Sequence, residues 1–448
     1  MQSANYHEIA DAIVAELRAG KLRPGDRLPP QREFAYSRGI APSTAQRVYA
    51  ELSRRGVVSG EVGRGTFVRL AAAPVRPALA EPASLRIDLD LNFPAVPQQE
   101  ALLSGSLAEL MRRQEEWRAA FLPAVAYGTS SVRSAAAAFF SRLRLPLAAD
   151  RLLFAGNGKQ AIAAALAATV RRGEVLGVEP LTYPFIKTIA QKLGIRLFPL
   201  PLDDEGIEPA GLIEAHRDVG LSAIYLQPTL HNPLGTSMSA LRRGEIAEIL
   251  ATEGIVAIED AVYAFLHADA SPLQSIAPDE VVLIDSLSKR LTPGLTLGVM
   301  VVPRRLREDI ARALHSGAWV APSLAQTVCA RWMADGTAAK IVDAKRRDAA
   351  ARQSLARQWL GRFGPLANPQ AYHCWLPLPG SWRADAFVAA AARHNIAVTP
   401  GSAFAVAPGH VPNAVRLALS APPVELLSEA LEKLASLLDG GSDASPPD

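Results

Sequence analysis

Hydrophobic and polar residues alternate with helical and then β spacing along the first 70 residues. Apolar side chains recur every three to four positions from Tyr6 to Leu17, which predicts an amphipathic helix. After a turn-rich connector, two shorter helices are predicted over 31–39 and 41–56, and β-rich runs around a glycine tip over 57–68 predict a hairpin. The inward positions expected on the third helix are Ala45, Val48, Tyr49 and Leu52.

The same 70 residues allow two interpretations. Two short helices joined by a turn at Gly39 have the proportions of a helix-turn-helix, whose second helix enters the major groove of DNA. The hairpin is then a wing that brings Arg64 to a groove or to phosphate. Alternatively, three small helices and a hairpin form only a domain cap, with outward Arg and Gln side chains in solvent.

From about residue 85, helical patterns alternate with seven short β-rich runs. This alternation predicts an α/β domain with a mostly parallel sheet between two layers of helices. We expect a winged helix-turn-helix at 1–70, an Ala/Pro-rich linker at 71–84 and the α/β domain at 85–448, with a small C-terminal subdomain from about 330 to 448. The runs are RLLFAG, EVLGVE, IRLFPLP, SAIYLQP, GIVAIED, VVLIDS and GVMVVP.

Composition narrows the class of protein. No apolar run approaches the roughly 18 residues that a membrane span needs, the start of the chain does not read as a signal peptide, and a cytoplasmic protein is expected. The cysteines Cys329 and Cys374 suggest neither a disulfide framework nor a zinc cluster. Residues 1–70 carry 11 Lys/Arg and 7 Asp/Glu, against 36 and 37 in the remainder, so the basic excess lies at the N-terminus, as expected of a nucleic-acid-binding module.

Polar residues follow the predicted strands, at the end of a parallel sheet where binding sites form. The turn Asn157-Gly158-Lys159-Gln160 opens an Ala-rich helix, whose N-terminus favours a phosphate, although a plain glycine turn explains it equally well. A cap is the alternative for Asp260, and a surface position the alternative for Lys289. Together, a phosphate cradle, a carboxylate and a reactive lysine are what pyridoxal 5'-phosphate (PLP) requires.

The N-terminal segments LRPGDRLPPQREFA, STAQRVYAELSRRG and GRGTFV resemble the winged helix-turn-helix of GntR-type regulators. The resemblance implies binding to double-stranded DNA, with Arg32 at a phosphate and Arg64 in the wing that enters the minor groove. The recognition helix would present Ser43, Thr44, Gln46 and Arg47. Relatives often have Ser-Arg where this chain has Ala41-Pro42, so a phosphate contact is expected to be lost there.

The remainder resembles a fold-type I aminotransferase domain, and the whole chain is similar to the MocR subgroup of GntR regulators, with the pattern of its YdcR-like members. The matching blocks are EPLTYP, YLQPTLHNPLGTSM, IEDAVY, SLSKRLTPGLTLG, TPGSAF and VRLALS. The resemblance implies that Lys289 bonds covalently to PLP, that Asp260 pairs with the pyridine nitrogen, and that Arg416 receives a ligand carboxylate. Further cofactor contacts are implied for Asn157, Gly158, Lys159, Tyr183, Asn232, Tyr263, Ser286 and Ser288.

Two positions depart from the family pattern. Thr296 stands where an arginine usually binds the cofactor phosphate, and we hypothesise that Arg290 or Lys159 supplies the missing cation. The segment before Arg133 is shorter than in the family, which argues against Tyr127 as a phosphate ligand of a neighbouring subunit.

Two functions agree with these features. The first is a homodimeric transcriptional regulator whose aminotransferase-like domain senses PLP, an amino acid or an amine. The second is a working aminotransferase with an accessory DNA-binding module. The winged helix favours the regulator, because no step of transamination requires one.

Overall fold

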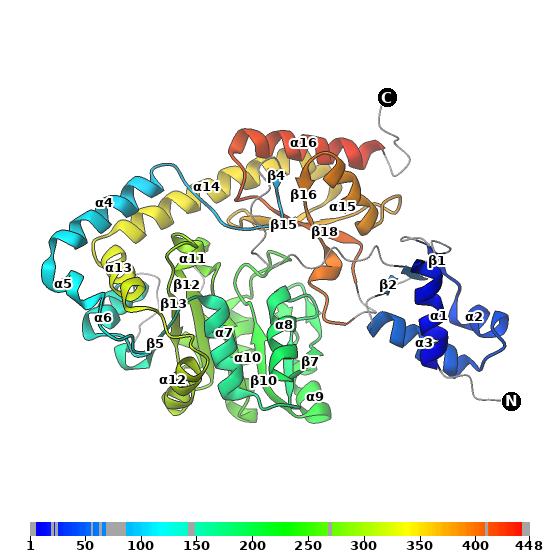
Figure 1. Cartoon of the computed structure of the whole chain (residues 1–448), viewed down its shortest axis with the longest axis horizontal. Coiled ribbons are helices and arrows are strands. Elements are labelled where there is room, and N and C mark those ends of the chain that lie inside the picture. Colours follow the sequence, from blue (N-terminus) through cyan, green and yellow to red (C-terminus); the bar gives the residue numbers. More distant parts are fainter. Residues whose placement is uncertain are drawn as a thin grey trace.

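The computed structural model consists of a small N-terminal module beside a larger body (Figure 1). It describes residues 6–18, 22, 26–54, 57–61, 65–68, 87–141, 148–267, 271–407 and 411–440. The predicted linker at 71–84 and Arg64 of the wing lie outside the described residues. Among the helices of the described ranges, none is both long and apolar enough to cross a membrane.

The N-terminal module contains three helices and a three-stranded antiparallel sheet with strand order β1-β3-β2. The predicted helices and hairpin are present, and the predicted inward residues of the third helix are all buried. The sequence did not predict β1, which is only two residues long and therefore carries no periodic signal. The elements are α1 (Tyr6–Arg18), β1 (Arg27–Leu28), α2 (Gln31–Ser37), α3 (Pro42–Arg54), β2 (Val58–Glu61) and β3 (Gly65–Val68).

A seven-stranded sheet organises the larger body, and its strand order is β5-β13-β12-β11-β10-β6-β7. Only β13 runs antiparallel to its neighbours, so the mostly parallel α/β sheet predicted from the sequence is confirmed. All seven predicted runs form its strands: β5 (Leu152–Ala155), β6 (Val175–Val178), β7 (Arg196–Pro199), β10 (Leu221–Leu226), β11 (Val256–Asp260), β12 (Val281–Ser286) and β13 (Gly298–Val301).

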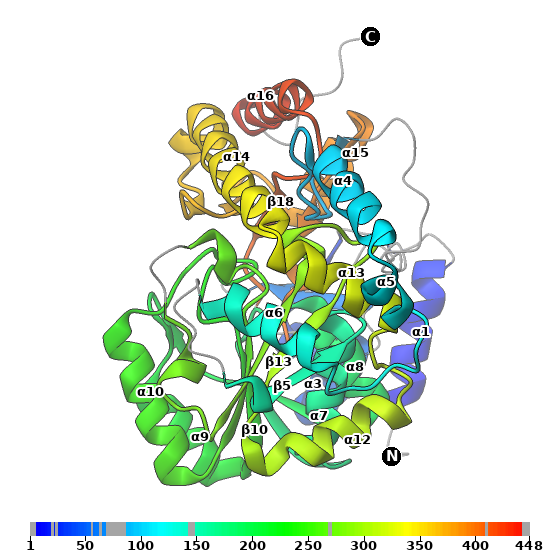
Figure 2. The ribbon, with the colours of Figure 1, turned by 90° about the vertical axis from the view of Figure 1, so that its left-hand side faces the viewer.

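Helices cover both faces of this sheet, each with its own apolar cluster (Figure 2). One face packs against α7 (Gly158–Thr169), α8 (Pro184–Leu193) and α12 (Arg307–Ser316). The other face packs against α9 (Pro209–Val219) and α10 (Ala240–Glu253) in one half, and against α6 (Ser130–Ser141) and α13 (Ser323–Ala334) in the other. Most strand positions are apolar because both faces of the sheet are buried, and the exceptions include Arg196 of the edge strand β7 and the polar residues that end β11 and β12.

A smaller C-terminal layer carries a four-stranded antiparallel sheet with strand order β14-β15-β18-β17. The 24-residue helix α14 (Thr337–Leu360) runs into it from the larger sheet (Figure 2). Its other elements are β14 (Leu366–Ala367), β15 (His373–Pro377), α15 (Ala384–Arg393), β16 (Ile396–Ala397), β17 (Thr399–Pro400), β18 (Ala414–Ala418) and α16 (Val424–Gly440). The first described residues after the linker, β4 (Ile87–Asp88), pair with β16, and α4 (Gln99–Arg112) and α5 (Gln114–Ala119) follow.

Candidate functional site

At one end of the large sheet, the C-terminal ends of the neighbouring strands β12, β11, β10 and β6 lie side by side, and β5 ends on the same side beyond the antiparallel β13. Residues that the sequence singled out follow β5, β6 and β10 or end β11 and β12, so the fold gathers them into one group of side chains, which we term the pocket. This arrangement follows from the parallel strand directions, which place successive strand ends side by side. The residues are Asn157, Tyr183, Asn232, Asp260 and Ser286.

Lys289 lies beside this edge, in the four-residue helix α11 (Leu287–Arg290) that follows β12. Its ammonium nitrogen Nζ donates to the Asn92 carbonyl at 2.6 Å and lies 3.5 Å from the centroid of the Phe93 ring. Burial, and next the positive charge of Arg416, lower the pKa of Lys289 to about 7. A lysine with this pKa is partly neutral near pH 7, as attack on a carbonyl carbon requires.

Asp260 ends β11 and is buried, with hydrogen bonds to both carboxylate oxygens. Oδ2 accepts from the Tyr225 hydroxyl at 2.6 Å and from Gln227 Nε2 at 3.2 Å, and Oδ1 accepts from the Val262 amide at 3.1 Å. Burial raises the pKa of Asp260 to about 6, although the three hydrogen bonds oppose this shift. The carboxylate is therefore held in a fixed orientation, where a cationic ring nitrogen would stabilise its charge.

Three further side chains line the same pocket. Asn232 is buried, and within the described structure its side-chain oxygen has no hydrogen-bond partner. Tyr263 receives a hydrogen bond from Asn92 Nδ2 at 3.3 Å. Burial, followed by the nearby Tyr263 and Asp260, raises the pKa of Tyr183 well above its usual value, so these hydroxyls stay protonated. An orphaned oxygen and two neutral phenols provide donors and acceptors for a polar ligand.

Hydroxyl groups and a helix N-terminus form a separate cradle beside Lys289. The Ser286 hydroxyl oxygen lies 2.8 Å from that of Ser288 and 3.4 Å from that of Thr296. Gly158 begins α7 next to them, and a Cβ added there would lie 3.3 Å from Ser286 Cβ. Asn157 fixes this helix start, because its side-chain oxygen accepts from the Gln160 amide at 3.0 Å. Such a cradle is suited to a phosphate group.

Lys159 and Thr296 are the two residues near this cradle that concern the missing arginine. Lys159 follows Gly158 in α7, and the Thr296 hydroxyl lies beside that of Ser286. Thr296 contributes a neutral hydroxyl where the related block has arginine. The Lys159 ammonium lies 3.5 Å from the centroid of the Phe185 ring, and its charge contributes to the lowered pKa of Lys289. Burial lowers the pKa of Lys159 itself. Lys159 is therefore a cation close to Lys289, and its role as the phosphate-binding cation stays a prediction.

Arg290 does not lie in the pocket, and for this residue the hypothesis is wrong. It is 1% exposed and forms a buried ion pair with Asp285, in which Nε donates to Oδ1 at 2.9 Å. Its guanidinium faces the rings of Phe140 and Phe265, at 5.3 and 5.1 Å. Consecutive residues of a helix point about 100° apart, so with Lys289 in the pocket its neighbour faces the core.

Arg416 approaches the pocket from β18 of the C-terminal sheet. It is buried, donates from Nη2 to the Thr399 hydroxyl at 2.8 Å, and also donates to the Asp90 carbonyl. The Asp90 carboxylate lies 3.7 Å from the same nitrogen, and within the described structure Arg416 Nε has no hydrogen-bond partner. A buried guanidinium with a free donor is suited to a carboxylate ligand.

Residues 90–93, which we term the pocket segment, were not predicted to belong to the site. They connect β4 to α4 and contact three of the predicted groups: Lys289, Tyr263 and Arg416. The predicted site residues lie at strand ends, and this segment precedes the sheet in the chain. Its DLNF sequence, with an amide and a ring beside apolar residues, was the available signal.

In the N-terminal module, the predicted DNA-binding residues lie on one structural unit. Arg32 is exposed on α2, and Ser43, Gln46 and Arg47 are exposed on α3, with Thr44 half-buried. The helices α2 and α3 are joined at Gly39, whose φ of +63° suits glycine. This geometry leaves the outer face of α3 available to a DNA groove.

Two family models match the chain and together account for most of it. The model for class I and II aminotransferases matches residues 87–434, and the model for bacterial regulatory proteins of the gntR family matches residues 5–68. The HTH-type transcriptional regulator YdeF of Bacillus subtilis is 31% identical over 97% of this chain and 94% of its own length. The chain belongs to the MocR subgroup of GntR-type regulators.

Other comparisons agree with this MocR-type architecture. The vitamin B6 salvage pathway transcriptional repressor PtsJ of Salmonella typhimurium is 29% identical over 90% of this chain and 92% of its own. An archaeal alanine:glyoxylate aminotransferase shares the fold, with a TM-score of 0.72 and 22% identity over 79% of this chain and 91% of its own. The chain thus joins a DNA-binding domain to a fold-type I aminotransferase-like domain, the plan of a PLP-related transcriptional regulator.

The pocket of this MocR-type regulator fits PLP. The hydroxyl cradle at the start of α7 suits the phosphate, the buried Asp260 suits the pyridine nitrogen, and Asn232 with its unpaired oxygen lies with Tyr263 on the phenolic side. Lys289 offers a primary amine in the same pocket. Tyr127 instead donates its hydroxyl to Glu308 on α12 at 2.7 Å, so within the described chain it belongs to the surface.

Proposed function

We propose that the aminotransferase-like pocket of this regulator senses PLP, or an amino acid or amine bound beside it, and transmits its occupancy to the winged helix. The pocket segment is the observation that supports this proposal. Its main-chain carbonyls at Asp90 and Asn92 accept hydrogen bonds from Arg416 and Lys289. A ligand that binds these two side chains must replace both hydrogen bonds.

The pocket segment lies in the chain between the DNA-binding module and the large sheet, so loss of its hydrogen bonds to Arg416 and Lys289 can affect both. Residues 90–93 follow β4 directly, and the chain before β4 leads to the DNA-binding module. A shift of the segment therefore pulls on the connection between the two domains. A ligand alters the balance of two domain arrangements only through such a difference in contacts.

Each pocket residue has a proposed role toward the cofactor. PLP, when bound, supplies an electron-withdrawing ring attached to the ligand amine. Lys289 provides the attachment point, Asp260 keeps the ring nitrogen protonated, Asn232 and Tyr263 bond to the phenolic oxygen, and Tyr183 stacks on the ring. Lys159 provides the cation that Thr296 lacks, beside the phosphate contacts of Asn157, Gly158, Ser286 and Ser288.

Arg416 is the proposed anchor for an effector carboxylate. Its guanidinium reaches the pocket from β18, whereas the hydroxyl cradle belongs to α7 and β12. A bidentate pair with an amino-acid carboxylate would satisfy the unpaired Nε and replace the Asp90 contacts. An amine without a carboxylate would leave Arg416 with Asp90. We therefore expect an amino acid and an amine to affect the pocket segment differently.

On the DNA side, α3 is the proposed reading element. Arg32 is proposed to contact phosphate, and the exposed residues of α3 are proposed to contact base edges together with Thr44. Arg64 of the wing is proposed to reach the minor groove. A protein that acts on promoter DNA in this way is expected in the cytoplasm.

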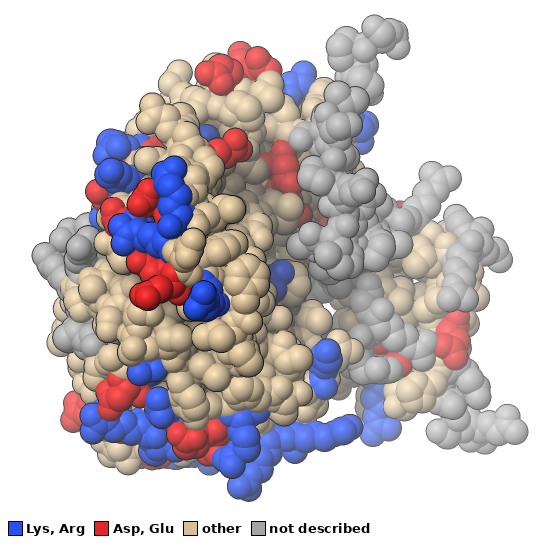
Figure 3. Space-filling model, turned by 60° about the vertical axis from the view of Figure 1, so that its left-hand side comes forward, with Lys and Arg blue, Asp and Glu red and all other residues tan. Residues whose placement is uncertain are grey.

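We further propose that the regulator is a homodimer. Large apolar side chains are exposed on the side formed by α4 and α5: Met111, Phe121 and Leu122 are 54%, 73% and 57% exposed. Figure 3 shows this side of the body, where a group of Lys, Arg, Asp and Glu side chains lies beside a broader surface of uncharged residues. Exposed large apolar side chains of this kind are typical of subunit interfaces.

Transamination is the second candidate function. The favouring observation is that the buried Asp260 and Arg416 both act on the pKa of the partly buried Lys289, so all three lie in one pocket. The presence of a winged helix on the same chain favours the regulator.

One experiment tests both candidates with full-length protein. A fluorescent DNA fragment from the protein's own upstream region is titrated with protein, without ligand, with PLP, and with PLP plus amino acids. We expect PLP to add a visible absorbance band and to change DNA affinity by about 5-fold or more, the lower end of typical allosteric coupling. Lys289→Ala should lose both effects, whereas Lys192→Ala, at an exposed lysine of α8, should keep them.

Two outcomes would contradict this proposal. Equal DNA affinity in all three conditions would exclude sensing. Repeated conversion of an amino acid and an oxo acid, read out as turnover through pyridoxamine phosphate, would support the aminotransferase instead.

A further inference from the structure

The lysine Lys345 is the most deeply buried cationic side chain that the proposed site does not use. It is 0% exposed and lies in the middle of α14. Its Nζ donates to the carbonyl of Lys289 at 3.0 Å and to the carbonyl of Leu291 at 2.7 Å. Both acceptors belong to the C-terminal end of α11, the short helix that carries the proposed cofactor lysine.

A four-residue helix leaves all but one of its carbonyls without intrahelical partners. In α11, the Leu291 amide bonds to the Leu287 carbonyl at 2.7 Å, and the following carbonyls need donors from elsewhere. Because this region is buried, an unpaired carbonyl would be costly, and a cation also interacts favourably with a helix C-terminus. Lys345 meets both requirements.

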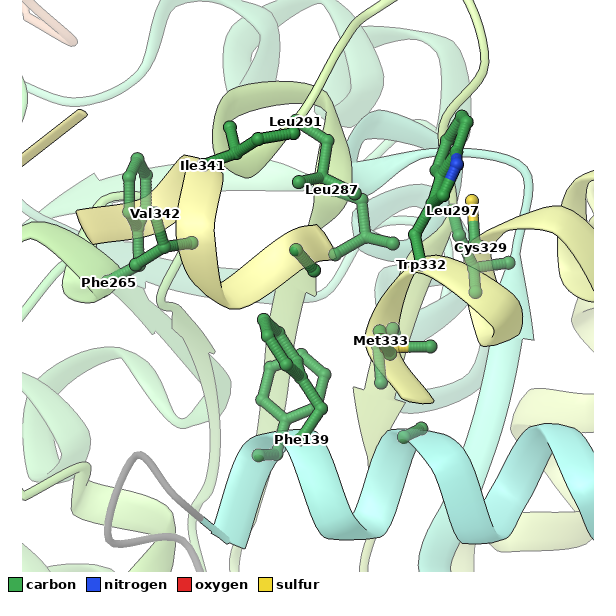
Figure 4. Packing of buried hydrophobic residues seen from close by; sticks show 14 of the residues in the cluster. Phe139, Phe265, Leu287, Leu291, Leu297, Cys329, Trp332, Met333, Ile341 and Val342 are labelled. Atoms are coloured by element: carbon green, nitrogen blue, oxygen red, sulfur yellow. The ribbon is translucent and has the colours of Figure 1, made fainter. Parts of the chain in front are cut away.

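Apolar packing fixes the distance between the two helices. Figure 4 shows Leu287 and Leu291 of α11 packed together with Ile341 of α14 in one apolar cluster. Lys345 follows Ile341 by four residues and therefore lies on the same face of α14. The Lys345 side chain is 0% exposed, and both hydrogen bonds of its Nζ go to carbonyls at the end of α11.

The opposite side of Lys345 is anchored as well. Its own carbonyl accepts from the Tyr372 hydroxyl at 2.8 Å, and the same hydroxyl bonds to Asp348 at 2.8 Å. Tyr372 directly precedes β15, whose neighbour β18 carries Arg416. Lys345 thus stands between the helix of the cofactor lysine and the layer that supplies the proposed carboxylate anchor.

We propose that Lys345 is a positioning residue for Lys289: it holds the α11 main chain so that Lys289 points at the cofactor. This inference rests on the proposed attachment of PLP to Lys289. It assigns to α14 a direct role in the pocket.

Electrostatics in this region agree with the geometry. Burial lowers the pKa of Lys345 to about 7, and Asp348 opposes this effect. Lys345 is one of three cations, with Arg416 and Lys159, that lower the pKa of Lys289, while Asp260 acts in the opposite direction. Burial and Arg416 lower the pKa of Lys289 more than Lys345 does. Removal of Lys345 should therefore raise the pKa of Lys289 without restoring it to the usual lysine value.

The test compares Lys345→Met with a matched variant on the same helix, Arg352→Met. Arg352 is also buried and donates to two carbonyls of the C-terminal layer, those of Leu419 and Pro422, both at 2.7 Å. It also pairs with Asp348 at 2.8 Å, but it does not contact α11 in the described structure. Two quantities are measured on PLP-loaded protein: the rate of cofactor loss to a PLP-binding scavenger, and the pH midpoint of the absorbance band.

We expect Lys345→Met to lose PLP about 10-fold faster, the change that corresponds to the loss of one or two buried hydrogen bonds. Its absorbance midpoint should move to higher pH, while Arg352→Met should keep both wild-type values even if it is less stable. Lys345→Gln, which keeps a donor without the charge, serves if the methionine variant does not fold, and its midpoint should also rise.

Two results would overturn the inference. The first is an unchanged midpoint together with unchanged cofactor loss in a folded Lys345 variant. The second is an equal change in Arg352→Met, which would indicate a general effect of weakening α14. A wild-type protein without any PLP band would instead contradict the proposed cofactor attachment.

Discussion

At the scale of single residues, neighbours in the sequence have separate tasks. Lys289 faces the pocket, whereas Arg290 faces the apolar cluster and neutralises Asp285. The position of Arg290 beside the reactive lysine suggested a ligand for the cofactor phosphate. Its ion pair with the buried Asp285 gives it a structural role instead. Lys159, in the first turn of α7, is a cation whose charge acts on Lys289.

The ion pair gives a prediction on stability. Arg290→Met leaves Asp285 buried without its partner and should lower the free energy of unfolding by about 3–5 kcal/mol, the usual cost of breaking a buried pair. The double variant Arg290→Met with Asp285→Leu should recover much of this loss. Chemical denaturation of the three proteins measures the difference.

Cofactor binding provides the control for the same variants. In the folded double variant, PLP affinity should stay within about threefold of wild type, a change of under 1 kcal/mol. A loss of PLP affinity comparable to that of Lys159→Ala would restore Arg290 as a phosphate ligand.

At the scale of elements, helix starts and strand ends decide where chemistry occurs. Asn157 caps α7 and thereby aims its free amides at the hydroxyl cradle. The recognition helix α3 begins differently, with Pro42 as its first residue and Ala41 before it. The Ala41 carbonyl accepts from the amides of Thr44 and Ala45, but its methyl group offers no side-chain acceptor.

This difference predicts that Ala41→Ser stabilises the N-terminal module. A serine hydroxyl at the position before α3 can accept from a first-turn amide, and such caps contribute about 1 kcal/mol. The midpoint of thermal unfolding of the module should rise, and Ala41→Gly should not reproduce the increase. A lower midpoint for the serine variant would mean that its side chain does not reach the first turn.

Element prediction succeeded where periodicity was long. All seven strands of the large sheet and all three helices of the winged helix agree with the apolar pattern. The two-residue β1 was missed, because no period is visible over two positions. The pocket segment was missed for another reason: it has no regular structure, and its function depends on main-chain carbonyls that every sequence possesses.

At the scale of the whole molecule, the proposed dimer and the proposed signal depend on surfaces that are far apart. The apolar side of α4 and α5 lies on the body opposite to the N-terminal module (Figure 1). The pocket segment leads into α4 at one end and toward the winged helix through β4 at the other. A change in the pocket can therefore reach both the subunit interface and the DNA-binding module.

The dimer proposal predicts that charges on the apolar surface separate the subunits. Phe121→Asp combined with Leu122→Asp should shift the protein from dimer to monomer in sedimentation equilibrium, because buried carboxylates at an interface are costly. Leu241→Asp, at a 75% exposed position on α10, serves as the control and should leave the oligomeric state unchanged. A double variant that sediments like wild type would contradict the proposed interface.

The sequence by itself determined the kinds of element, the order of the strands along the chain and the residues at their ends, including Lys289 and Asp260. These features depend on local periodicity, and the parallel directions of the strands bring the strand ends together at one end of the sheet. The tertiary structure alone decided which way neighbours face and what they meet. Arg290 against Asp285, Lys345 beneath α11 and the pocket segment over Lys289 result from packing between distant parts of the chain, which local patterns do not encode.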